Sequence, residues 1–162
     1  MEFQEILYTI AQVAATLAGF ASVVAVLERA DSQRELAVQH LLKRMLATSF
    51  SVMFFSIVLA TVLASTEHSN LVWRWSNVAF GLFHLVGIST DQLPKFQGTV
   101  VKRGQLYLIY PVASMLILLN FAVGAGYLQD YAPLTFICGL CWLMGVACWF
   151  FAILVMSTRR ST

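Results

Sequence analysis

Long apolar runs decide the fold of this chain, and the first of them, ILYTIAQVAATLAGFASVVAVL, covers residues 6–27. This run has no charged residue and exceeds the roughly 20 residues that a helix needs to cross the hydrocarbon core of a bilayer. Comparable runs follow at residues 45–64, 71–90, 106–128 and 134–156. The sequence therefore predicts an all-α membrane protein with five transmembrane helices.

The composition agrees with a protein that lies in lipid. Apolar residues make up 59% of the 162 residues and charged residues only 11%, whereas a soluble domain is roughly 25% charged. The connections between the runs are short, so we expect residues 1–162 to form a single transmembrane domain. No phosphate-binding glycine loop, nucleophile motif or catalytic carboxylate pair is present in the sequence. We therefore expect a protein that is not an enzyme.

The basic residues predict the orientation, because Lys and Arg near the ends of transmembrane helices stay in the cytoplasm. Nine of the ten fall on one side of the five runs: Arg29, Arg34, Lys43, Arg44, Lys95, Lys102, Arg103, Arg159 and Arg160. This partition places the N-terminus outside and the C-terminus in the cytoplasm. It also accounts for the net charge of +2 without a nucleic-acid partner.

The segment before the second run carries a helix-start signal. Ser32 precedes Glu35 by three residues, which is the capping-box pattern, and it predicts a helix from about residue 33 that continues beyond residue 64. Its first turns would extend into the cytoplasm as a charged stalk. Residues 29–44 and 91–105 are accordingly candidate docking segments for a cytoplasmic protein partner.

The first run has two patterns that favour self-association. Ala11, Ala15 and Gly19 follow one another at intervals of four, and small residues in this spacing let helices approach closely in lipid. A polar stripe runs beside them at helical spacing, formed by Glu5, Thr9, Gln12, Thr16 and Gly19. In a homo-oligomer with this helix around the axis, the stripe would line a polar path. In a monomer it would bond to neighbouring helices instead.

The third run places Arg74, Asn77, Gly81 and His84 on one helical face. Polar groups at membrane depth usually turn toward the interior of a bundle. Counted from the outer helix ends, Asn120 lies at the depth of Asn77 and Ser114 at the greater depth of His84, so we predict a polar path or cavity lined by Asn77, His84, Ser114 and Asn120. The alternative is a structural hydrogen bond between helices. Arg74 is expected to extend outward to the head groups, and Trp73 to belong to an aromatic belt at the interface.

The sequence CGLC at residues 138–141 is the remaining chemical motif. Cys138 and Cys141 match the spacing of thiol redox proteins, but with Gly145 and Cys148 they also form one small-residue face suited to helix packing. His40, His68 and His84 fall at three different depths, which predicts no metal site, and no cofactor is expected.

These patterns favour a small integral membrane protein that forms a channel-like homo-oligomer, with a polar path along the first helix, the third helix, or both. A non-conducting sensor or assembly subunit that docks a cytoplasmic partner is the alternative, and a membrane thiol oxidoreductase is the third hypothesis. The first run resembles the small-residue helices of many short bacterial membrane proteins, a likeness that implies no activity. We expect an integral membrane protein of the bacterial inner (plasma) membrane.

Overall fold

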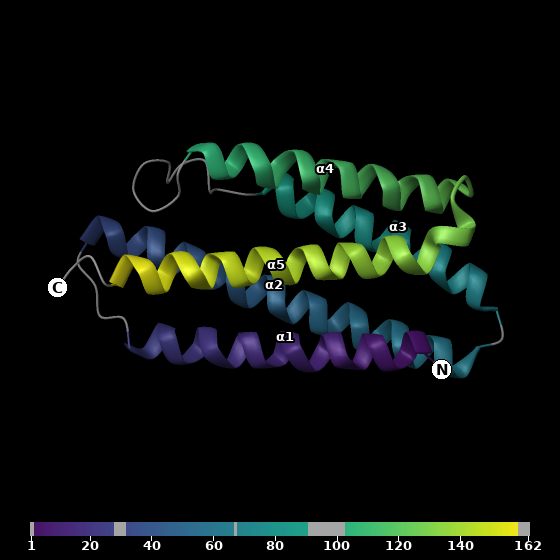
Figure 1. The fold of residues 1–162 in the computed structure, drawn as a ribbon, viewed down its shortest axis with the longest axis horizontal. Helices are drawn as coiled ribbons and strands as arrows, with labels where there is room; N and C mark the ends of the chain where they lie inside the picture. The colour runs from purple at the N-terminus through teal and green to yellow at the C-terminus, as the bar shows by residue number, and fades with distance from the viewer. Residues whose placement is uncertain (1, 28–31, 67, 91–102, 159–162) are drawn as a thin grey trace.

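The computed structural model describes residues 2–27, 32–66, 68–90 and 103–158 (Figure 1). Its elements are helices, in the order α1 (Glu2–Leu27), α2 (Ser32–Ser65), α3 (Ser69–Ser89), α4 (Arg103–Ala125), the short 3-10 turn η2 (Gln129–Tyr131) and α5 (Ala132–Thr158). Within these described ranges there is no strand. The predicted all-α fold is confirmed.

Four of the helices are long and apolar enough to cross a bilayer, with spans at Phe3–Val23, Val38–Ser65, Tyr107–Ala125 and Gln129–Val155. Helix α3 has 21 residues, which is sufficient length, but it is not among the four helices that are apolar enough over such a length. Membrane insertion is therefore supported by α1, α2, α4 and α5. The fifth span, the orientation and the bacterial inner membrane remain predictions.

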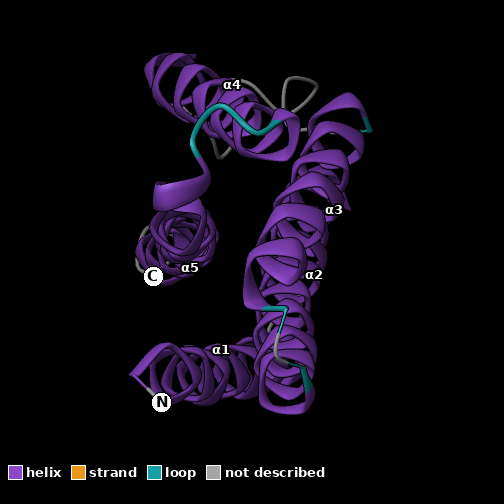
Figure 2. Cartoon of the chain, turned by 90° about the vertical axis from the view of Figure 1, so that its right-hand side faces the viewer, coloured by secondary structure: helices purple, strands orange, loops and turns teal. Residues whose placement is uncertain are grey.

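The helices form two layers, seen end on in Figure 2. Helices α2 and α3 make one side, and α1, α5 and α4 make the other. Helix α5 lies between α1 and α4 and contacts all four other helices, whereas α1 lies at the edge and packs mainly on α2. The start of α1 and the end of α5 are at opposite ends of the bundle (Figure 1). Because α1 lies at the edge, the described residues leave one of its faces uncovered.

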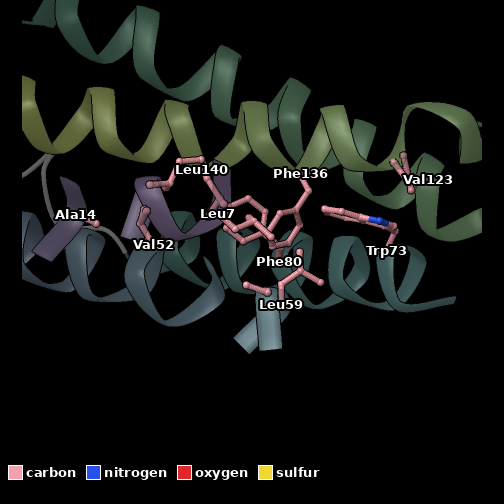
Figure 3. Packing of buried hydrophobic residues seen from close by; sticks show 12 residues of the cluster. Leu7, Ala14, Val52, Leu59, Trp73, Phe80, Val123, Phe136 and Leu140 are labelled. Atoms are coloured by element: carbon pink, nitrogen blue, oxygen red, sulfur yellow. The ribbon is translucent and has the colours of Figure 1, made fainter. Parts of the chain in front are cut away.

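Aromatic side chains from α2, α3 and α5 fill the centre of the bundle, and Figure 3 shows those of α3 and α5. Phe80 of α3 is fully buried, with its ring centroid 4.9 Å from that of Phe136 on α5 and 5.1 Å from that of Phe55 on α2. Trp73 lies two turns earlier on the same face of α3 and is only 5% exposed. Its ring centroid is 6.0 Å from that of Phe136. The expectation that Trp73 belongs to an interfacial belt is therefore wrong, because its helical face turns toward α5.

The first described side chains of α2 also pack within the bundle. Leu41 and Met45 are buried among residues of α1 and α5. From Val38 onward, therefore, α2 packs within the bundle and is not a free stalk. The cluster that joins the three helices comprises Ala21, Val38, Leu41, Leu42, Met45, Ala147, Phe150, Ile153 and Leu154.

Helix α4 ends in a Schellman motif that turns the chain toward α5. The Tyr127 amide donates to the Ala122 carbonyl and the Gly126 amide to the Val123 carbonyl, both at 3.0 Å. Gly126 has a φ of +94°, a conformation that side chains with a Cβ atom rarely adopt. The motif leads into the start of α5, which lies close to the first half of α3, where Asn77 bonds to Ala132.

Candidate functional site

The polar residues expected to line one path fall into two separate groups. Glu5, Thr9, Gln12 and Thr16 on α1 are exposed, and so is Ser114 on α4. Asn77, His84 and Asn120 are buried between the helices. Within one chain, therefore, the two groups do not meet, and their functional roles have to be considered separately.

Asn77 joins α3 to the start of α5. Its side-chain Nδ2 donates to the Trp73 carbonyl at 2.8 Å and to the Ala132 carbonyl at 3.1 Å. Both bonds involve a completely buried amide, and in the described residues its Oδ1 has no partner. This geometry supports the structural alternative for Asn77, a hydrogen bond between two helices.

Asn120 has a similar environment on α4. Its Nδ2 donates to the Leu116 carbonyl one turn earlier, at 2.7 Å. Gly81 of α3 lies directly opposite, and a methyl group added there would come within 3.2 Å of the Asn120 Cβ. Gly81 is thus buried at a close approach of α3 and α4, as the packing prediction proposes.

Arg74 binds to protein rather than reaching freely toward the head groups. Its Nε donates to the Gly124 carbonyl at 2.6 Å. Gly124 lies in the last turn of α4, where carbonyls lack an intrahelical partner and a positive charge is favourable. Arg74 therefore caps the end of α4 and does not extend freely to the head groups as expected.

The face of α3 that carries Asn77 and His84 is interrupted by aromatic packing. The Phe80 ring lies between them along the helix, and its centroid is 4.5 Å from that of the His84 ring at an interplanar angle of 87°. The fully buried Phe80 and Phe136 occupy the space that a continuous polar path would need. The face consequently offers a local cavity instead of a route across the bundle.

That cavity lies between α2, α3, α4 and α5 and measures about 110 Å³. His84 borders it, is 6% exposed, and has no hydrogen-bond partner on either ring nitrogen among the described residues. Arg44 of α2 lies beside it and donates from Nη2 to the Gly87 carbonyl at 3.3 Å. The lining residues are Arg44, Ala47, Thr48, Phe83, His84, Gly87, Ile88, Ile109, Tyr110, Ala113, Trp142, Leu143, Val146 and Phe150.

Sequence reasoning identified His84 but missed Arg44, Thr48 and Trp142 as its neighbours. These three side chains come from α2 and α5, and no local spacing links them to α3. A second hollow of about 480 Å³ lies at the opposite end of the bundle, lined by Phe3, Gln4, Leu63, Ser69, Asn70, Trp73, Gln129, Asp130 and Pro133.

The polar stripe of α1 faces away from the other helices. The hydroxyls of Thr9 and Thr16 donate to the carbonyls of Glu5 and Gln12 one turn earlier, both at 2.9 Å. No described residue offers a hydrogen bond to the exposed Gln12 amide. Glu5, which begins the stripe, is exposed as well.

The small residues of α1 divide between two faces. Ala11 is buried, together with Ala14, Ala18 and Ala21. Ala15 and Gly19 are exposed instead, and a methyl group added at Gly19 would meet no atom within 4 Å. Gly145 on α5 is also exposed and open. The expected packing role therefore has a partner in this chain at Ala11 and Gly81 but not at Ala15, Gly19 or Gly145.

The cysteines are free thiols on the exposed surface of α5, at Cys138, Cys141 and Cys148. In the described ranges there is no group of three His, Cys, Asp or Glu side chains that suits a metal ion. Comparison with protein-family models, curated proteins and solved structures finds no match. The fold and its apolar spans define the class as a helical membrane protein.

Proposed function

We propose that the protein is a channel-like homo-oligomer whose copies associate through the uncovered face of α1. The observation that carries this proposal is the exposure of Gln12 in the middle of an apolar span. A side-chain amide needs hydrogen-bond partners that lipid tails do not supply, and leaving it unpaired in hydrocarbon costs several kcal/mol. A second copy of the helix supplies such partners.

The rest of this face suits close contact between helices. Ala15 and Gly19 flank Gln12 and Thr16 on the exposed side of α1, and small residues allow helix backbones to approach. Gly19 has room for a neighbouring helix because nothing in the chain lies within 4 Å of its added methyl group. The edge position of α1 leaves this contact accessible.

The path in this oligomer would be lined by side chains of α1. Thr9, Gln12 and Thr16 contribute hydroxyl and amide groups at successive levels, and Glu5 contributes a carboxylate near the helix start. Rings of carboxylates favour cations. The α3 face is a weaker choice for the path because Phe80 and Phe136 fill it. The path would therefore conduct a small cation.

A pair of glycine variants tests the assembly. Gly19→Leu would place a large side chain in the contact, whereas Gly145→Leu is the matched control, since both glycines are exposed and open in the single chain. We expect Gly19→Leu to convert the oligomer to monomers in native mass spectrometry from mild detergent, and Gly145→Leu to leave it intact. A wild-type protein that is monomeric under these conditions would contradict the proposal.

A pair of threonine variants tests the path. Thr16 and Thr61 are both exposed and both donate to the carbonyl one turn earlier, at 2.9 and 2.8 Å, but only Thr16 lies on the α1 stripe. Thr16→Val should lower the flux of potassium ions from reconstituted vesicles, and Thr61→Val should not. Equal effects of the two variants would argue against a path along α1.

The two other hypotheses have less support from the described residues. The proposed docking segments, residues 29–44 and 91–105, lie largely outside the described side chains. Cys138 and Cys141 are free, exposed thiols, and no group of metal-binding side chains occurs among the described residues. A sensor or assembly role and a redox role therefore stay predictions.

A further inference from the structure

The cavity beside His84 contains an unusual combination of features for the interior of a membrane bundle. His84 is buried, with only 6% of its surface exposed, and neither ring nitrogen has a hydrogen-bond partner among the described residues. The Phe80 carbonyl lies near the ring, one turn earlier, but outside hydrogen-bond geometry. A neutral imidazole offers one donor and one acceptor. His84 therefore presents both to whatever occupies the cavity.

Packing holds the imidazole in place. The Phe80 ring contacts it edge-on, with centroids 4.5 Å apart, and the Phe83 ring lies on another side at 6.4 Å. Its backbone is in the last third of α3, between the buried Phe80 and the end of the helix at Ser89. An imidazole fixed in this way is oriented for a ligand before that ligand arrives, which lowers the entropic cost of binding.

The size and walls of the cavity suit one flat ring. Its volume of about 110 Å³ is smaller than the roughly 150 Å³ of an apolar cavity that holds a benzene molecule, but the cavity is partly open, so it can take the oxygen-bearing edge of a ring while the rest of the ring extends out through the opening. Phe83, Trp142 and Phe150 contribute aromatic walls from α3 and α5. Aromatic side chains bind another ring by offset or edge contacts with centroids roughly 4.5–7 Å apart.

We propose that this cavity binds the ring of a lipid-soluble quinone, with a ring oxygen hydrogen-bonded to His84. In the quinone form the oxygen accepts a hydrogen bond from the imidazole N–H. In the quinol form the hydroxyl donates a hydrogen bond to an imidazole nitrogen that carries no hydrogen. Both forms can therefore bind to the same residue. A ligand that resides in the bilayer also reaches a site between transmembrane helices without crossing water.

Two other occupants fit the cavity less well. A water cluster needs several polar partners for each molecule, but most of the lining side chains are apolar or aromatic. An anionic lipid head group needs clustered cations, and in the described lining Arg44 is the single Lys or Arg side chain. Its guanidinium already donates to the Gly87 carbonyl. The ring ligand uses the aromatic walls and His84 together.

Duroquinone and durene form a matched pair of probes. They share a tetramethyl-substituted six-membered ring, but only duroquinone has oxygens, and its full substitution protects the exposed cysteines from alkylation. Equilibrium binding to the full chain in nanodiscs should give one duroquinone site per chain. Durene should bind roughly five- to tenfold more weakly, the effect expected for one lost hydrogen bond.

Two substitutions locate the site. His84→Leu should lower duroquinone affinity to the level of durene and leave durene binding unchanged, whereas Ala79→Leu, on the exposed side of α3, should change neither. Gly87→Leu should reduce the binding of both probes by tenfold or more, because it adds a side chain at the cavity wall where no atom lies within 4 Å of a new methyl group. Gly145→Leu is its control on the outer surface.

The outcomes separate the alternatives. Equal affinity for duroquinone and durene, or a His84→Leu variant that binds duroquinone as well as the wild type, would overturn the proposal. A third result would also overturn it: decanoate binds tightly, Gly87→Leu abolishes this binding, and duroquinone does not bind. The site would then recognise an anion. A monomeric protein that still binds duroquinone supports this inference while removing the proposed oligomeric channel, so the two proposals fail independently.

Discussion

Gly139 of α5 lies at a close contact between α5 and α3. It is buried, and a methyl group added there would clash with the Cε1 atom of Phe80. Phe80 cannot easily move away, since it is fully buried and its ring contacts Phe55, His84 and Phe136. We therefore predict that Gly139→Ala destabilises the protein.

The magnitude follows from two opposing effects. Replacing Gly by Ala inside a helix gains up to about 1 kcal/mol from helix propensity, and overpacking a core costs about 1–3 kcal/mol. Gly145→Ala on the same helix receives only the gain, because nothing lies within 4 Å of its added methyl group. Gly139→Ala should consequently be less stable than Gly145→Ala by about 1–3 kcal/mol.

Reversible unfolding in mixed detergent micelles, followed by circular dichroism, measures this difference. The double variant Gly139→Ala with Phe80→Leu gives a second test, because a smaller side chain at position 80 makes room for the methyl group. Its loss of stability should be smaller than the sum of the two single losses by about 0.5 kcal/mol or more. If Gly139→Ala proves as stable as Gly145→Ala, the packing of α3 on α5 described above is incorrect.

Three further predictions follow from the site and the topology. Arg74→Leu should lower the free energy of unfolding by about 1.5–3 kcal/mol, the value of a hydrogen bond made by a charged group. Arg74→Lys should recover less than half of this loss. An Arg74→Leu variant as stable as the wild type would show that the bond to Gly124 contributes nothing. Replacing all three cysteines by Ala should change neither stability nor ion flux, and a reversible disulfide between Cys138 and Cys141 that responds to quinone would instead favour redox chemistry. In that cysteine-free chain, a thiol reagent added outside should label His68→Cys but not Gln97→Cys, and labelling at position 97 would reverse the predicted orientation.

The helices could be predicted from the sequence because long apolar runs leave the backbone few alternatives in lipid. Helix α2 begins at Ser32 and continues to Ser65, close to the range that the capping box and the absence of a breaker indicate. The faces of the helices were harder to predict. Lipid is as apolar as a protein core, so Trp73 has the same sequence signal whether it faces α5 or the bilayer.

The surroundings of the candidate site were also only partly predictable from the sequence. Helical spacing placed His84 on an inward face, but its cavity is completed by Arg44 and Trp142 from α2 and α5, and no local pattern connects three helices. The α1 stripe was recognised by spacing, whereas its direction depends on which face Ala14 and Ala18 present to α2. Those alanines are buried, and this turns Gln12 and Gly19 away from the bundle.

Cross-linking in native membranes tests most directly the claim that copies of the chain meet through α1. A single cysteine is introduced at Gly19 or, as a control, at Gly145 in the chain that lacks the three native cysteines. On mild oxidation we predict a disulfide-linked dimer for Gly19→Cys and monomer for Gly145→Cys, since only the first lies on the proposed contact. Monomer alone at Gly19→Cys, and equally at Gln12→Cys and Thr16→Cys, would contradict the account.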